Sequence, residues 1–118
     1  MSGGISVHVV DVTRARPASG MLVEIYQLDG DDRSLVASAR LGAAGALDDP
    51  VTEGHGIEAG RYEVILHIGD YYRSEGLVSL SPAFLEDAPF RFTVENAAEH
   101  YHLPVKMSPW GYSIFRGS

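Results

Sequence analysis

The sequence predicts an all-β sandwich of seven to eight strands with one short helix. Short runs rich in β-branched and aromatic residues recur along the 118-residue chain, separated by turns rich in glycine and proline. Within several runs, apolar and polar residues alternate, which is typical of strands that bury one face. No long amphipathic segment of helical period is present. We therefore expect a single domain spanning residues 1–118.

The elements follow in order along the chain. In the first strand, Ile5, Val7 and Val9 form an apolar row, so His8 faces the other way. The stretch 42–60 is rich in glycine and acidic residues, which indicates loops with room for one short strand. Residues 70–76 leave room for a helical turn or two. The other expected strands cover residues 21–28, 35–41, 61–68, 90–94, 101–107 and 112–115.

Pro104 conflicts with the strand expected over residues 101–107. Proline has no N–H to donate to a neighbouring strand. This strand is therefore expected to lie at the edge of a sheet, or to leave the ladder locally unpaired at Pro104.

Composition and charge exclude several classes of function. The net charge of −7 argues against nucleic acid and anionic membranes as partners. Because the chain has no cysteine, disulfides, thiol catalysis and thiolate metal sites are excluded. We expect no membrane span and no signal peptide, and the sequence is compatible with a cytoplasmic location.

Histidines are the candidate functional residues. In the tail strand, the inward row is apolar, so His100 and His102 are expected to face outward with His8. If both strands belong to one sheet, these imidazoles share a surface and can exchange protons near neutral pH. An isolated histidine on a solvated strand is usually only a surface residue, and we interpret His55 and His67 in that way.

A metal site is the competing interpretation of these histidines. Residues two apart on a strand share a face, so His100 and His102 have the spacing of metal ligands, and His8 could add a third. The sequence shows no nearby carboxylates to complete or orient such a site. We therefore expect no metal and no cofactor.

Four motifs occur in order at characteristic spacing: ISVHVVDVTRARPASGMLVEIYQL, GIEAGRYEVILHIGDYY, PAFLEDAPFRFTV and HYHLPVKMSPWGYSIFRGS. Together they resemble the transthyretin-like 5-hydroxyisourate hydrolases over nearly the whole chain. The resemblance implies a transthyretin-like (prealbumin-like) sandwich and a homotetramer built as a dimer of dimers. It also implies hydrolytic opening of a cyclic amide, by default 5-hydroxyisourate in urate breakdown, with no metal required.

The resemblance also implies the site residues. His8 and His102 flank the small cyclic substrate, and Ser118 helps to shape the pocket. The chain departs from the family pattern at two substrate contacts: Ala46 stands where the pattern has an arginine, and Phe115 where it has a tyrosine. The tail residue Arg116 is kept, and the sequence leaves open whether Arg40, Arg73 or Arg116 replaces the missing cation. At the turn near the start, Ala15 replaces a glycine.

These departures leave two alternatives. One is a diverged enzyme that acts on a different, less polar cyclic metabolite, with a biosynthetic role as one option. The other is a non-catalytic carrier that binds a small ligand, as transthyretin does. The retained His8 and His102 favour an enzyme, whereas Ala46 and Phe115 favour a changed ligand.

Overall fold

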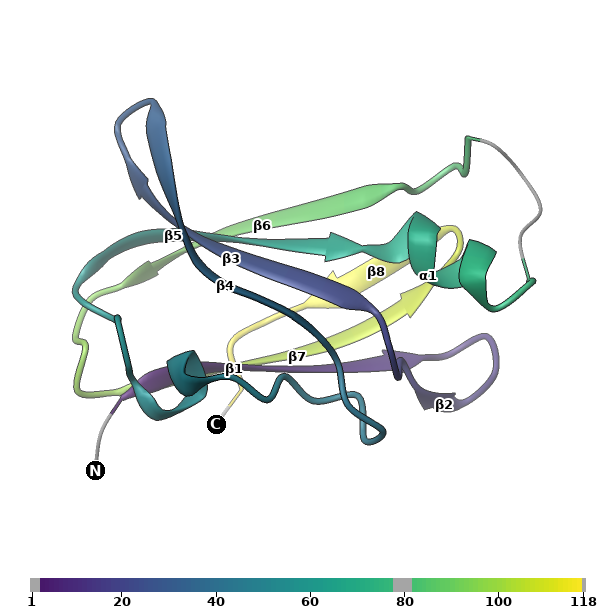
Figure 1. Ribbon diagram of the computed structural model, residues 1–118, viewed down its shortest axis with the longest axis horizontal. Coiled ribbons are helices and arrows are strands. Elements are labelled where there is room, and N and C mark those ends of the chain that lie inside the picture. The colour runs from purple at the N-terminus through teal and green to yellow at the C-terminus, as the bar shows by residue number, and fades with distance from the viewer. Residues whose placement is uncertain (1–2, 78–81, 118) are drawn as a thin grey trace.

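Two four-stranded β-sheets pack face to face in the computed structural model, which describes residues 3–77 and 82–117 (Figure 1). The first sheet has the strand order β2-β1-β7-β8, and the second has the order β4-β3-β5-β6. This arrangement confirms the all-β sandwich with one short α-helix. The elements are β1 (Gly4–Asp11), β2 (Arg16–Pro17), β3 (Leu22–Asp29), β4 (Asp32–Arg40), a 3₁₀ helix (Pro50–Glu53), β5 (Gly60–His67), α1 (Ile68–Ser74), β6 (Asp87–Val94), β7 (His100–Ser108) and β8 (Gly111–Ile114).

Strand β1 pairs with β7 in parallel, and the other paired strands of both sheets run antiparallel. In this register Gly4 lies opposite His100, and Ser6 lies opposite His102. A parallel pair needs a long connection between its strands, and here the whole second sheet supplies it. Pairing the first long strand with the last one brings the two histidine-bearing segments together.

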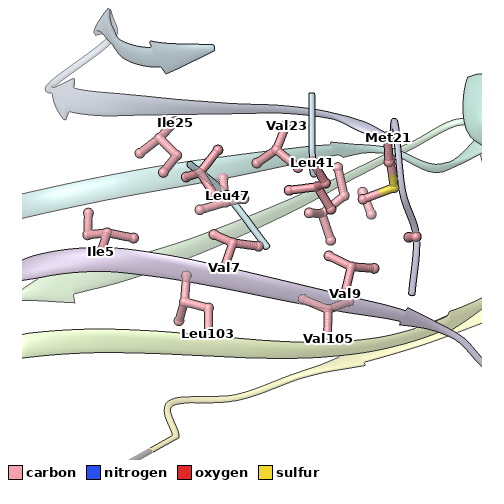
Figure 2. Packing of buried hydrophobic residues seen from close by; sticks show 14 of the residues in the cluster. Ile5, Val7, Val9, Met21, Val23, Ile25, Leu41, Leu47, Leu103 and Val105 are labelled. Atoms are coloured by element: carbon pink, nitrogen blue, oxygen red, sulfur yellow. The ribbon is translucent and has the colours of Figure 1, made fainter. Parts of the chain in front are cut away.

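The core lies between the sheets. Val7 of β1 and Leu103 of β7 point toward Ile25 of the opposite sheet (Figure 2). The inward rows predicted from alternation are buried in both strands, with residues such as Ile5 and Val105 at most 1% exposed. Burial of these apolar faces holds the outward residues on a rigid support.

Pro104 lies in an interior strand, because β7 runs between β1 and β8. The expectation of an edge position is therefore wrong, and the alternative of a local gap in the ladder is confirmed. Strand β8 pairs with β7 only from Val105 onward, and the next tail contact is the Gly117 N–H bonded to the His102 carbonyl oxygen. The missing donor of Pro104 falls between these two contacts.

Several element boundaries differ from the sequence prediction, and β6 begins at Asp87 rather than at residue 90. Strand β4 begins at Asp32 rather than residue 35, because the β3–β4 hairpin turns through only Gly30 and Asp31. Gly30 has a φ of 61°, which a two-residue hairpin loop accommodates easily with glycine. Helix α1 begins at Ile68, two residues earlier than expected, and none of the helices in the described ranges is long and apolar enough to cross a bilayer.

Candidate active site

Three histidines and one serine gather on the outer face of the first sheet. Ser6 and His8 come from β1, and His100 and His102 come from β7. All four are half-buried, while their strand neighbours Ile5, Val7, Tyr101 and Leu103 are buried in the core. The predicted outward direction of His8 and His102, and their place in one sheet, are both observed.

Ser6 joins the two histidines of β7. Its hydroxyl oxygen lies 2.6 Å from Nδ1 of His102 and 2.8 Å from Nε2 of His100. The other ring nitrogen of His100 lies 3.4 Å from the carbonyl oxygen of Gly3. Sequence reasoning missed Ser6 as a site residue. The alternation in β1 already turned Ser6 outward, but only the β1–β7 register shows that it meets both imidazoles.

His8 is held by the segment that follows β4. Its Nε2–H donates to the carbonyl oxygen of Ala44 at 2.9 Å. The same segment bonds to β1 on either side of His8, through Val9 N–H to Gly45 O and Leu47 N–H to Val7 O. It provides the short extended stretch for which the sequence left room in residues 42–60. Ala46 thereby lies opposite His8 in an antiparallel bridge and is exposed.

The chain tail closes over the other side of the cluster. Gly117 donates its N–H to the carbonyl oxygen of His102 at 2.7 Å. A Cβ atom at residue 117 would stand 2.9 Å from Cγ of Pro104 and 3.1 Å from Cδ2 of His102, so this close approach requires glycine. The tail is therefore packed against β7 at Gly117. Ser118, for which the resemblance implies a role in the pocket, lies outside the described residues.

None of the three candidate arginines reaches the imidazoles of His8 and His102 in the described part of the chain. Arg116 bonds to Glu99 at 3.0 Å and lies over the ring of Tyr101, 4.1 Å from its centroid. Since Tyr101 belongs to the inward row, this guanidinium lies on the other side of β7 from the imidazoles. Arg40 donates to the Gly20 carbonyl oxygen, and Arg73 pairs with Asp70 and Glu86. Phe115 is 54% exposed.

The environment of His102 favours its neutral form. Burial lowers the pKa of His102 below its usual value of 6.5, and the positive charges that His100 and His8 can carry lower it further. A neutral imidazole with one free ring nitrogen is suited to accept a proton near neutral pH.

Nε2 of His100 and Nδ1 of His102 both bond to the hydroxyl of Ser6, so these two nitrogens do not point at a shared position where a metal ion could bind. Among residues 3–77 and 82–117, no group of three or more histidine, cysteine, aspartate or glutamate side chains is arranged to hold a metal ion. In the described residues, the chemistry available at this face is proton transfer and hydrogen bonding by imidazole, hydroxyl and backbone groups.

The fold and the outward histidines define a transthyretin-like sandwich, and comparison with known proteins agrees. The family described as HIUase/Transthyretin matches residues 5–117, and the chain belongs to this family. A protein named 5-hydroxyisourate hydrolase 2 from Rhizobium meliloti is 44% identical over 117 residues, which cover 99% of this chain and 98% of that protein.

Solved structures of other proteins share the fold. The structure of Klebsiella pneumoniae 5-hydroxyisourate hydrolase has a TM-score of 0.80 at 26% identity and covers 98% of this chain and 99% of that one. The crystal structure of an (S)-allantoin synthase has a TM-score of 0.88 at 32% identity. That match covers 99% of this chain but 44% of the synthase chain.

Proposed function

We propose that this chain is a hydrolase that opens a cyclic amide, with 5-hydroxyisourate as its substrate in urate breakdown. The observation that carries the proposal is the pair His8 and His102, held on one outer face by backbone and side-chain hydrogen bonds. Relatives named 5-hydroxyisourate hydrolase match along the full chain, which supports the same chemistry here. We take residues 1–118 as one catalytic domain, and we propose a cytoplasmic location, which suits a cysteine-free chain.

Hydrolysis of a ring amide needs a base, an acid and a water molecule. The water oxygen bonds to the carbonyl carbon while one imidazole takes a proton from the water. The ring C–N bond then breaks, and the leaving nitrogen receives a proton as the carboxylate product forms. His8 and His102 supply the two imidazoles, and Ser118 is proposed to line the same pocket. Backbone and side-chain donors around the site would stabilise the negative charge that develops on the carbonyl oxygen.

We also propose that the active form is a homotetramer, a dimer of dimers whose outer faces meet over the histidines. The half-buried histidines lie on the face of the monomer turned away from its own core. The exposed aromatic residues Trp110, Tyr112 and Phe115 cluster along the C-terminal segment, where contact with another subunit would bury apolar surface. A monomer by light scattering at micromolar concentration would contradict this assembly.

One specific observation favours a second candidate function. The position opposite His8 carries only the methyl group of Ala46, and the tail carries the phenyl ring of Phe115. A site with these two side chains offers less hydrogen bonding to a polar ring than one with arginine and tyrosine. The alternative substrate is therefore a different, less polar cyclic metabolite, and the non-catalytic alternative is a small-ligand carrier.

The experiment adds the pure protein to 5-hydroxyisourate freshly generated from urate and compares its disappearance with the spontaneous rate. We expect acceleration that is lost in His102→Ala and kept in His55→Ala, because His55 is an exposed histidine that takes no part in the hydrogen bonds of Ser6, His8, His100 and His102. Equal loss in both variants would contradict the assigned site. Stoichiometric ligand binding without any acceleration would favour the carrier.

A further inference from the structure

A chain of hydrogen bonds runs behind His102 across β1 and β7. It joins the carbonyl oxygen of Gly3, the His100 ring, the Ser6 hydroxyl and the His102 ring, with successive distances of 3.4, 2.8 and 2.6 Å. His100 uses both of its ring nitrogens in this chain, whereas His102 uses only Nδ1. Among residues 3–77 and 82–117, Nε2 of His102 has no hydrogen-bond partner, so this nitrogen is the end of the hydrogen-bond chain that is available for chemistry.

The carbonyl oxygen of Gly3 sets which atom donates in each of these hydrogen bonds. A backbone carbonyl oxygen can only accept a hydrogen bond, so Nδ1 of His100 carries a proton. Neutral His100 then has a lone pair on Nε2, which accepts from the Ser6 hydroxyl. Because that hydroxyl has only one proton to give, its oxygen accepts from Nδ1–H of His102. Nε2 of His102 is left with a free lone pair.

We propose that Ser6 and His100 are positioning residues that hold neutral His102 in its Nδ1–H form, so that Nε2 is the base. The identity of the proton source, a water attacking a cyclic amide, rests on the function proposed above. The tautomer of His102 does not depend on that function and can be measured in the free protein.

The same hydrogen bonds also stabilise His102 after its Nε2 has accepted a proton. When Nε2 takes a proton, Nδ1–H still donates to Ser6, so no hydroxyl has to rotate. The bond from the imidazolium to Ser6 becomes charge-assisted and hence stronger. If the Ser6 hydroxyl instead donated to Nδ1 of His102, the proton of the neutral ring would be on Nε2. Nε2 could then not accept a proton from the substrate side.

His8 is held differently, which separates the two imidazoles. Its Nε2–H donates to the Ala44 carbonyl oxygen, so the nitrogen that can gain or lose a proton is Nδ1. The two histidines therefore offer different ring nitrogens to the site, and of the two, His102 is the one whose proton is oriented by a hydroxyl and a second imidazole.

The test combines ring-nitrogen NMR with two shape-matched variants of Ser6. In the native protein, long-range nitrogen–proton correlations at alkaline pH should show the Nδ1–H form of His102. Ser6→Thr keeps the hydroxyl and should keep this form. Ser6→Val has the shape of threonine without the hydroxyl, suits a strand, and should lose the preference. Loss of a hydrogen-bond partner that orients a metal-bound histidine typically costs about 10- to 100-fold in activity. By analogy, we expect a fall of about that size in kcat for valine and little change for threonine.

Each result decides the proposal. A native His102 in the Nε2–H form overturns it, and so does a valine variant that keeps both the tautomer and the rate. The expected tautomers without any hydrolysis by the native protein would retain the positioning by Ser6 but refute the proposed function. The free-protein spectra thus separate failure of this inference from failure of the enzyme assignment.

Discussion

Ala46 lies directly opposite His8 in an antiparallel bridge, and its methyl group is exposed on the outer face of the first sheet. Residues directly opposite in a bridge project to the same side, so a longer side chain at this position would extend beside the His8 imidazole. The position at which the family resemblance implies a substrate-binding arginine is thus next to a candidate catalytic residue.

Restoring polar contacts should therefore raise 5-hydroxyisourate hydrolysis. We expect Ala46→Arg combined with Phe115→Tyr to increase kcat/KM by about tenfold to a thousandfold, because a site gains strongly from polar groups that pair with the substrate. Steady-state assays of the native, single and double variants check this. Ala43→Arg is the matched control, since it adds the same charge to the same exposed loop without facing His8 in a bridge. Equal gains from both arginines would indicate general electrostatic attraction instead.

The sequence predicted the directions of side chains better than their partners. Alternation in two strands placed His8 and His102 outward correctly, since period two is a local property of each strand. The meeting of Ser6 with His102 depends on a parallel register between segments 96 residues apart, which no local pattern encodes. For the same reason, Pro104 was compatible with both an edge strand and a gap in the ladder until β8 was seen to end beside it.

The activity should fall on the acid side as His102 takes up a proton. Burial, with added repulsion from His100 and His8, lowers the pKa of His102 below 6.5, so the neutral base persists below that pH and is lost as the pH falls through the lowered pKa. The pH profile of kcat/KM, which reports groups of the free enzyme, should therefore have its acid limb below pH 6.5. An NMR titration of His102 should give the same midpoint, and a midpoint above 6.5 would contradict this environment.

The same shift has a consequence for stability. Below pH 6.5 the unfolded chain binds a proton at His102 more readily than the folded chain does, so acid lowers the free energy of unfolding. His102→Gln removes this titration. The variant should lose less stability than the native protein between neutral pH and about pH 5, as denaturant unfolding at both pH values would show. If the free energy of unfolding fell equally with pH in the native protein and in His102→Gln, the pKa of His102 would not be lowered.

Gly117 should be required for its close approach to His102 and Pro104. Gly117→Ala places a methyl group within 3.1 Å of the His102 ring, so the ring or the tail must move. We expect a fall in kcat of at least about tenfold, because small displacements of a positioned base are costly. Gly111→Ala is the control, since a Cβ at residue 111 meets nothing within 4 Å. Native-like turnover by Gly117→Ala would show that the close packing of the tail is not needed to position His102.

Ala15 has a strained backbone conformation at a position where the family resemblance implies glycine. The resemblance marks it as a replaced turn glycine, and its φ is 53°, in the left-handed region that favours glycine. Because a side chain in this conformation costs roughly 1–2 kcal/mol, partly offset by the greater flexibility of glycine in the unfolded chain, Ala15→Gly should stabilise the protein by about 1 kcal/mol.

Ala43→Gly is the matched control. It is also an exposed turn alanine, but its φ is not positive, so glycine there should leave stability unchanged or lower it. Urea unfolding of the three proteins measures the difference, and a loss of stability in Ala15→Gly would show that this turn is not strained. Because Ala15 lies in the β1–β2 turn, away from the histidine face, the gain should come without a change in catalytic rate.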